Sequence, residues 1–464
     1  MNMTFRVKLP FSPDRMVGTE SLVPLLDGSR RAYVNLDNAA STPALREVRD
    51  VVSTFLNWYS SVHRGAGFKS QVSTEAYEAA RETVRRFVGG NAREHVTIFG
   101  KNATEAINKL AHRLPLGEDD VVLVSMLEHH SNDLPWRRRA RVEHIRADAA
   151  GRLDEDHYQE LLQQHAGHVR LVAVTGGSNV TGFMPRIHWL AAKAHAAGAQ
   201  ILVDCAQLAP HRRIEMGLLA DPAHLDYVAL SAHKLYAPFG SGALVGRADT
   251  FAEGAPEYSG GGTVDFVGLD GIAWAEGPER DEAGSPNVIG AIAFAAAIDA
   301  LEAIGMDTVA AHEEELTAYA LARLGRIPGI DIYGDPNPRG AGTRLGVIPF
   351  NVAGMHHGLV AAILSQEFGI GVRNGCFCAH PYLVHLLGLG EQDVSAIRSR
   401  IAQGDRRQVP GLVRASFGAY NTTDDVDALA EALDCIVTHG PSGSYDQDRA
   451  TGDFRLSEKL ACLG

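Results

Sequence analysis

The stretch LDYVALSAHK, from Leu225 to Lys234, decides the fold of this chain of 464 residues. Its apolar run ends at Leu230 and predicts a buried strand, which the polar group Ser231-Ala232-His233-Lys234 follows at once. Lys234 is therefore expected at the carboxyl end of a strand, the edge at which open α/β sheets bind their ligands. A lysine there can form a Schiff base with an aldehyde, although most lysines near strand ends are solvated surface groups.

A second predicted strand ends in a carboxylate. The run Ile201-Leu202-Val203 ends in Asp204, which can pair with a protonated ring nitrogen or simply cap the helix that follows. Asp204 and Lys234 thus end two separate strands of one sheet. The turn Asn102-Ala103-Thr104-Glu105 leads into a helix whose N-terminal amides can hold a phosphate. Together these residues indicate a ligand site at one edge of the sheet.

From about residue 70 to 245, apolar strand-like runs alternate with helical patterns, which is typical of a mostly parallel sheet wrapped by helices. We predict an α/β fold with a large domain at 35–305 and a smaller α+β domain from 1–34 and 306–440. Residues 441–464 are expected to be a mobile C-terminal tail, because the segment begins rich in Gly, Ser and Asp. Strands of the large domain are expected at 96–99, 121–124, 169–175, 200–204, 225–230 and 242–245.

The chain is acidic, with 43 Lys and Arg against 56 Asp and Glu and a net charge of −13, which argues against a nucleic-acid or anionic-membrane binder. Its longest nearly uncharged apolar stretch, 289–298, is much shorter than the about 20 residues of a membrane span. Residues 1–20 lack the apolar segment of a secretory signal, so a cytoplasmic protein is expected. Five cysteines are too few for a disulfide scaffold.

These residues belong to a longer series of motifs that resembles the class V aminotransferase family of fold-type I pyridoxal-phosphate (PLP) enzymes, and most closely its group II cysteine desulfurases. The resemblance runs from about residue 34 to 436. Its segments are Leu36-Asp37-Asn38-Ala39-Ala40-Ser41, Val62-His63-Arg64-Gly65, Glu128-His129-His130-Ser131-Asn132, Ser178-Asn179-Val180-Thr181-Gly182, Val203-Asp204-Cys205-Ala206-Gln207, Ser231-Ala232-His233-Lys234, Gly260-Gly261-Gly262, Glu282-Ala283-Gly284-Ser285-Pro286-Asn287, Arg373-Asn374-Gly375-Cys376-Phe377-Cys378 and Arg414-Ala415-Ser416.

The resemblance implies a role for each matching residue. Lys234 would carry pyridoxal 5'-phosphate as a Schiff base and move the proton of the substrate α-carbon, and His129 would stack on the ring. Asp204 would pair with the pyridine nitrogen. Arg414 would receive the substrate α-carboxylate, beside Asn179 and Arg373. The remaining cofactor contacts would come from Thr104, Asn179, Gln207, Ser231, His233 and Ser285, the last reaching over from the other subunit of a homodimer.

The family's Arg-x-Gly-x-x-Cys pattern places Cys378 over the cofactor, where its thiolate would take the substrate sulfur as a persulfide and alanine would leave. Arg373, His380 and the cofactor site are expected to lower the pKa of this thiol. Cys378 could instead be an inert buried cysteine. Cys376 stands where the family often has a histidine, so it competes for the nucleophile role.

Several alternatives remain open from the sequence. Glu128-His129-His130 and Cys376-Phe377-Cys378 contain potential metal ligands, but no further pair at the usual spacing completes a set, so no metal is expected. Asn374 and the pair Gly176-Gly177 depart from the pattern, and the missing side chains would enlarge the substrate pocket. This favours an aminotransferase or carbon-sulfur lyase as the alternative enzyme. A catalytically idle sulfur-transfer partner is a further alternative. The Arg- and Asp-rich segment 391–408 has two interpretations: it covers the active site or the dimer edge, or it is a solvated helix. A protein that accepts the sulfur is a possible partner.

Overall fold

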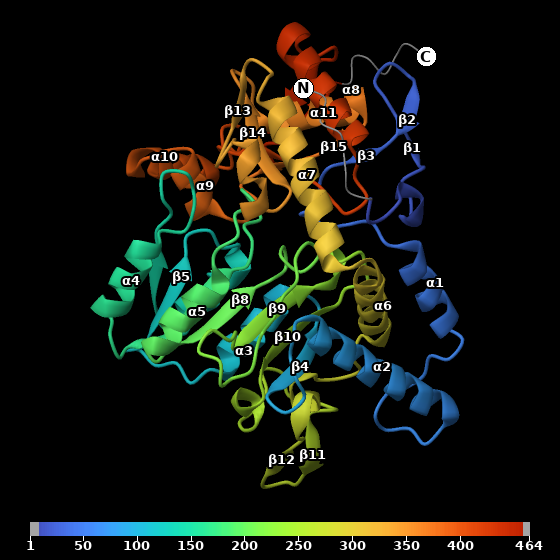
Figure 1. Ribbon diagram of the computed structural model, residues 1–464, viewed down its shortest axis with the longest axis vertical. Coiled ribbons are helices and arrows are strands. Elements are labelled where there is room, and N and C mark those ends of the chain that lie inside the picture. The colour runs from blue at the N-terminus through green and yellow to red at the C-terminus, as the bar shows by residue number, and fades with distance from the viewer. Residues whose placement is uncertain (1–8, 458–464) are drawn as a thin grey trace.

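The computed structural model describes residues 9–457, and its largest element is a seven-stranded sheet in the order β4-β10-β9-β8-β7-β5-β6 (Figure 1). β10 runs antiparallel to both of its neighbours, and the pairs from β9 to β6 are parallel. The predicted α/β fold with a mostly parallel sheet is therefore confirmed. The strands are β4 (His95–Gly100), β5 (Val121–Ser125), β6 (Arg141–Ile145), β7 (Val169–Thr175), β8 (Gln200–Asp204), β9 (Tyr227–Ser231) and β10 (Gly242–Arg247).

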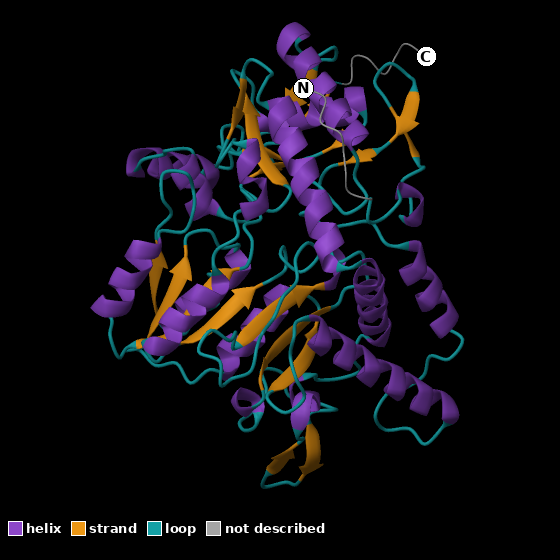
Figure 2. Cartoon of the chain, in the orientation of Figure 1, coloured by secondary structure: helices purple, strands orange, loops and turns teal. Residues whose placement is uncertain are grey.

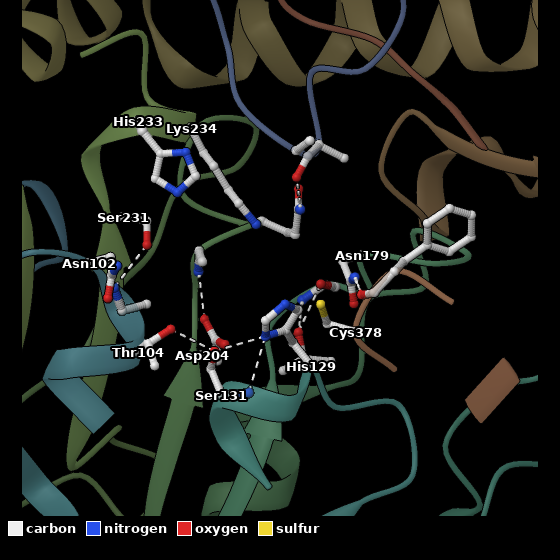
Figure 3. Close-up of a pocket in the computed structure, with 18 of the residues that line it drawn as sticks. Asn102, Thr104, His129, Ser131, Asn179, Asp204, Ser231, His233, Lys234 and Cys378 are labelled. Carbon is white, nitrogen blue, oxygen red and sulfur yellow. Dashed lines mark hydrogen bonds between the residues drawn. The ribbon is translucent and has the colours of Figure 1, made fainter. Parts of the chain in front are cut away.

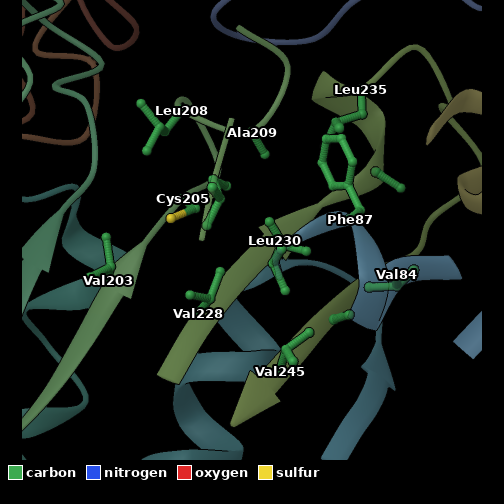
Figure 4. Packing of buried hydrophobic residues seen from close by; sticks show 14 of the residues in the cluster. Val84, Phe87, Val203, Cys205, Leu208, Ala209, Val228, Leu230, Leu235 and Val245 are labelled. Carbon is green, nitrogen blue, oxygen red and sulfur yellow. The ribbon is translucent and has the colours of Figure 1, made fainter. Parts of the chain in front are cut away.

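Helices cover both faces of this sheet (Figure 2). On one face, α3 packs through buried residues such as Ile107 and Leu110. The other face carries a larger core, in which Val203 and Leu230 meet residues of α2 and α6 (Figure 4). Cys205 is fully buried in this core, so it serves as a packing residue. The helices of this unit are α1 (Arg46–Phe55), α2 (Phe68–Phe87), α3 (Ala103–Arg113), α4 (Glu155–Gln164), α5 (Ile187–Ala196) and α6 (Val288–Ile304).

A second core forms after Gly305, which separates α6 from α7 with a φ of 90°. Its four-stranded sheet has the order β13-β14-β17-β16, and the β16–β17 pairing sets Arg373 opposite Arg414. The N-terminal β3 (Val34–Asn35) joins this unit by pairing with β15 (Ile370–Gly371). The other elements are α7 (Met306–Leu324), β13 (Ile330–Ile332), β14 (Val347–Val352), α8 (His357–Phe368), β16 (Arg373–Gly375), α9 (His380–Leu386), α10 (Glu391–Ala402), β17 (Leu412–Ser416) and α11 (Thr423–His439).

Residues 441–457, the described part of the predicted mobile tail, contain two short strands. β18 (Tyr445–Gln447) and β19 (Phe454–Leu456) pair there as an antiparallel hairpin. Residues 458–464, with Cys462, and residues 1–8 of the predicted small domain lie outside the described residues. α10 occupies most of the segment 391–408 and has no buried residue, which agrees with the solvated-helix alternative.

Among the described residues, no single helix is long and apolar enough to cross a membrane. One pair of consecutive helices, α6 with α7, has the length and composition of a membrane span, but the two helices are bent by 78° relative to each other.

A buried cluster of charges connects the two units. Glu313 of α7 accepts a hydrogen bond from His211 Nδ1 at 3.0 Å and one from the Gly346 amide at 2.7 Å, and it also pairs with Arg212. Burial alone would raise the pKa of Glu313, but His211 and Arg212 outweigh burial and lower the pKa to about 2.

We expect Glu313→Ala to lower the free energy of unfolding by about 3 kcal/mol, because it leaves buried cationic groups without their partner. Urea unfolding measures this change. The neighbouring exposed Glu314 supplies the control, since Glu314→Ala should change stability by at most about 0.5 kcal/mol. Equal stabilities of the two variants would contradict the expectation. The contribution of Glu313 should also disappear as the pH falls from about 4.5 toward 2, because its folded-state pKa is depressed.

Candidate active site

A cavity of about 230 Å³ lies at the carboxyl ends of β7, β8 and β9 and is closed by residues of the second unit (Figure 3). It brings together all but one of the site residues predicted from the sequence. The exception is Ser285, which borders two other cavities with Pro286. The predicted residues that line the cavity are Thr104, His129, Asn179, Asp204, Gln207, Ser231, His233, Lys234, Arg373, Cys378 and Arg414.

Lys234 and Asp204 enter the cavity from adjacent strand ends, because β8 pairs in parallel with β9. Burial lowers the pKa of Lys234 to about 8, although Asp204 opposes this shift. Burial also raises the pKa of Asp204, whose Oδ1 accepts a hydrogen bond from the Ala206 amide at 2.9 Å. A buried carboxylate with so little solvation favours a cationic or proton-donating partner in the cavity.

The N-terminus of α3 forms one end of the cavity. Asn102 caps this helix, and the Ala103 amide donates a hydrogen bond to Ser231 Oγ at 2.9 Å. Gly242 allows this close approach of helix and strand, since a Cβ atom there would lie 2.5 Å from Asn102 Cα. The Thr104 hydroxyl lies 2.6 Å from that of Ser131. Clustered hydroxyls beside a helix N-terminus suit an anionic group such as a phosphate.

His129 is neutral in this site. Burial, followed by the charge of Lys234, lowers its pKa to about 4. Its Nδ1 accepts a hydrogen bond from the Ser131 amide at 3.1 Å, so the ring orientation is set. Beneath it, Glu128 is fully enclosed and accepts hydrogen bonds from the Thr175 amide and the Asn132 side chain. Burial raises the pKa of Glu128 to about 8, and its hydrogen bonds connect the loop after β5 to the end of β7.

Arg414 connects the cavity to three neighbours. Nη1 donates to the Asn179 carbonyl at 2.9 Å, Nη2 donates to Asp37 Oδ1 at 2.9 Å, and the guanidinium lies 4.9 Å from the centre of the Phe377 ring. Its buried Nε has no hydrogen-bond partner within the described residues. Arg373 is more exposed and lies 4.0 Å from the other oxygen of Asp37. Sequence reasoning included Asp37 in a motif but gave it no role; its position in LDNAAS was the available signal.

The loop from 376 to 379 presents Cys378 to the cavity (Figure 3). Cys376 does not line the cavity and instead packs at the edge of a hydrophobic cluster. Phe377 and Cys378 have left-handed backbones, with φ of 52° and 55°, a strained state for such residues. Two distant residues hold this state: Asn179 Nδ2 donates to the Phe377 carbonyl and the His130 amide donates to that of Cys378, both at 2.7 Å.

Arg373 lowers the pKa of Cys378 as expected, but burial outweighs this effect and the pKa is raised. His380 stacks on the ring of His130, with centroids 5.0 Å apart. Gly177 lines the cavity, whereas the space into which a Cβ atom would point is occupied by a leucine side chain at both Gly176 and Gly177. A Cβ atom at Gly177 would lie 2.6 Å from Leu345 Cδ1, and one at Gly176 would lie 2.8 Å from Leu208 Cδ2.

The strand order and the lysine at the carboxyl edge of the sheet define a class, the fold-type I enzymes. The solved apo structure of a cysteine desulfurase from Thermococcus onnurineus superposes with a TM-score of 0.75 at 32% identity, covering 87% of this chain and 94% of that one. The model of the aminotransferase class-V family matches residues 34–429. The chain therefore belongs to the class V aminotransferase family, as predicted, and is an enzyme.

Relatives of known name agree with this assignment. The "Probable cysteine desulfurase" of Halalkalibacterium halodurans is 35% identical over 428 residues, which are 89% of this chain and 96% of that protein. The cysteine desulfurase of Haloferax volcanii is 34% identical over 431 residues, which are 91% of this chain and 93% of that protein.

Proposed function

We propose that this enzyme is a pyridoxal 5'-phosphate-dependent cysteine desulfurase that converts L-cysteine into alanine and a persulfide on Cys378. The observation that carries the proposal is the position of the Cys378 thiol in the same cavity as Lys234, Asp204 and Arg414. The names of the relatives support the same activity. The alternative of an aminotransferase or lyase for a larger amino acid is favoured less, because Leu345 and Leu208 occupy the space into which a Cβ atom at Gly177 and at Gly176 would point.

The cavity residues fit the cofactor. Asp204 is a buried carboxylate suited to the protonated ring nitrogen, and the α3 N-terminus with Thr104 and Ser231 suits the phosphate. Lys234 would supply the amine that holds the aldehyde. Gln207 lines the same cavity, and its Nε2 donates a hydrogen bond to the Ala39 carbonyl at 2.6 Å. When bound, the cofactor supplies an electron sink for the bonds of the substrate α-carbon.

Three residues of the chain carry out substrate binding, proton transfer and sulfur transfer. Arg414 binds the substrate carboxylate and so orients the substrate. Lys234 Nζ takes and returns a proton, and its pKa of about 8 suits this exchange near neutral pH. The Cys378 thiolate attacks the substrate sulfur. One sulfur-sulfur bond forms and the carbon-sulfur bond of the substrate breaks, with its electron pair passing to the substrate carbon. That carbon takes up one proton, which replaces the proton that the Cys378 thiol gave up before the attack, and the product leaves as alanine.

The proposal is tested by mass spectrometry of the cofactor-loaded protein after brief exposure to L-cysteine, with alanine measured in parallel. We expect one added sulfur on Cys378 and one alanine formed with it. Sulfur on Cys376 instead would keep the reaction but reassign the nucleophile. Absence of both sulfur and alanine from protein that binds the cofactor would overturn the proposed activity.

The rate at which the ligand-free protein takes up pyridoxal 5'-phosphate is expected to rise with pH and level off above about pH 8. Only the neutral amine reacts with the aldehyde, and at one pH unit below its pKa about a tenth of Lys234 is neutral. Stopped-flow absorbance measures this rate. A free lysine derivative serves as the control, since its rate should still rise beyond pH 9. A profile that follows the control would contradict the lowered pKa of Lys234.

We further infer a homodimer, a cytoplasmic location and transfer of the persulfide sulfur to a protein acceptor. The position of Ser285 outside the cavity supports the dimer, because the family role of this residue is to reach the partner's cofactor. A catalytic thiol that must stay free supports a reducing compartment. Light scattering at micromolar concentration tests the dimer, and a monomer of full activity would refute it.

A further inference from the structure

We propose that the C-terminal hairpin β18–β19 is a positioning element for the nucleophile loop, acting through Phe454, the His356-His357 pair and Asn374. The inference rests on the proposed function, since it assigns these residues to the sulfur-transfer step of the same site. The hairpin lies beyond residue 429, where the match to the family model ends.

The first residues of the hairpin are hydrogen-bonded to the C-terminal part of α8. Glu367, near the end of that helix, accepts hydrogen bonds from the Ser442 and Gly443 amides at 2.9 and 3.1 Å and from the Tyr445 hydroxyl at 2.9 Å. The hairpin also holds the chain before β17, because the Arg406 amide donates to the Arg449 carbonyl and Gln447 Nε2 donates to that of Arg407. It therefore bridges two segments that flank β16.

From the hairpin, contacts lead directly to the start of the nucleophile loop. The Phe454 ring lies 5.2 Å from that of His356, which lies 4.1 Å from that of His357. Asn374 Nδ2 is 3.3 Å from His357 Nδ1. Phe454 and Asn374 also meet at Gly358, where a Cβ atom would lie 3.3 Å from Phe454 Cδ2 and 3.5 Å from Asn374 Nδ2. Asn374 lies in β16, two residues before the loop 376–379 that carries Cys378.

The link has little freedom to adjust. His357 Nε2 lies 3.1 Å from the Val409 carbonyl, which only accepts, so Nδ1 is left to accept from Asn374. A Cβ atom at Gly411 would lie 2.6 Å from His357 Nε2 and 2.8 Å from Gly375 Cα. Such close packing transmits small displacements. Because Phe377 and Cys378 are held in a strained backbone state, a shift of β16 changes where the thiol points.

The experiment uses the cofactor-loaded full chain and compares Phe454→Ala, Glu367→Ala and Asn374→Ala with the wild type in a single turnover with L-cysteine. We expect each variant to form the Cys378 persulfide on the order of 10-fold more slowly, because a misplacement far from the chemistry costs such factors. The absorbance change of the bound cofactor on mixing should keep its wild-type rate. Phe454→Tyr, which keeps the ring, should restore the persulfide rate, and Arg455→Ala, on the exposed side of β19, should leave it unchanged.

A double variant decides whether Phe454 and Asn374 act through the same connection to the loop or affect the persulfide rate independently. Phe454→Ala with Asn374→Ala should be no slower than either single variant, because both break the same connection. Wild-type persulfide rates in all three single variants, or fully additive losses in the double variant, would overturn the inference. If Phe454→Ala does not fold, Glu367→Ala and Asn374→Ala decide by the same criteria. Failure of the wild type to form a persulfide would instead refute the proposed function, so the two failures are distinguishable.

Discussion

Replacing Cys378 with alanine is expected to abolish persulfide formation and to lower alanine production from L-cysteine on the order of 10³-fold or more, since the nucleophile itself is removed. Lys234 and Asp204 are untouched by this change, so the cofactor should bind as in the wild type. The two measurements are the alanine yield and the mass of the peptide that contains the loop. Normal cofactor absorbance with lost activity would place the defect at sulfur transfer.

The matched control is Cys376→Ala, because Cys376 lies two residues away but does not line the cavity. This variant should keep at least about half of the wild-type rate, as expected for a change at the edge of a hydrophobic cluster. Full activity in Cys378→Ala, or a loss in Cys376→Ala as large as that in Cys378→Ala, would contradict the assignment of the nucleophile.

Lys234→Ala is expected to lower turnover by at least about 10³-fold, because Lys234 is the only lysine that lines the cavity within the described residues. Borohydride treatment of the wild type should fix the cofactor mass to the peptide that contains Lys234, and the variant should show no such adduct. Binding without covalent attachment should persist, since Asp204, Thr104 and Ser231 remain.

Lys193→Ala on α5 is the control, since Lys193 lies on an outer helix over the ring of Trp189. It should retain both the adduct and the activity. Covalent attachment of the cofactor to the Lys234→Ala protein at another lysine would show that a second amine can reach the aldehyde, and retained turnover would refute the role of Lys234.

The sequence predicted most of the large sheet, because its inner strands are short apolar runs that end in polar residues. The predicted strand at 225–230 corresponds to β9 (Tyr227–Ser231), and that at 169–175 matches β7. It missed β6, an edge strand of sequence RVEHI of which only Ile145 is fully buried. It also missed two exposed hairpins, because their strands are only three or four residues long: β1 (Leu22–Pro24) with β2 (Arg30–Ala32), and β11 (Val264–Val267) with β12 (Ile272–Trp274).

The residues of the site were predictable wherever they follow strands or belong to the resemblance. Lys234 and Asp204 stand out because they end adjacent parallel strands, and such ends meet at one edge. Asp37, Ser131 and the Phe377 carbonyl were not given roles, because their importance depends on partners far away in the chain. Arg373 lowers the pKa of Cys378 as expected, but burial, which the sequence does not show, outweighs it.

The sequence by itself determined the fold class and the family and predicted Lys234 as the cofactor-binding lysine, because local apolar patterns and ordered motifs carry that information. It favoured Cys378 as the nucleophile but left Cys376 as a competitor. Only the tertiary structure separated them, by placing Cys378 in the cavity and Cys376 against a hydrophobic cluster. The physical reason is the left-handed backbone at Phe377 and Cys378, which hydrogen bonds from Asn179 and His130 hold and which no local pattern in the sequence encodes.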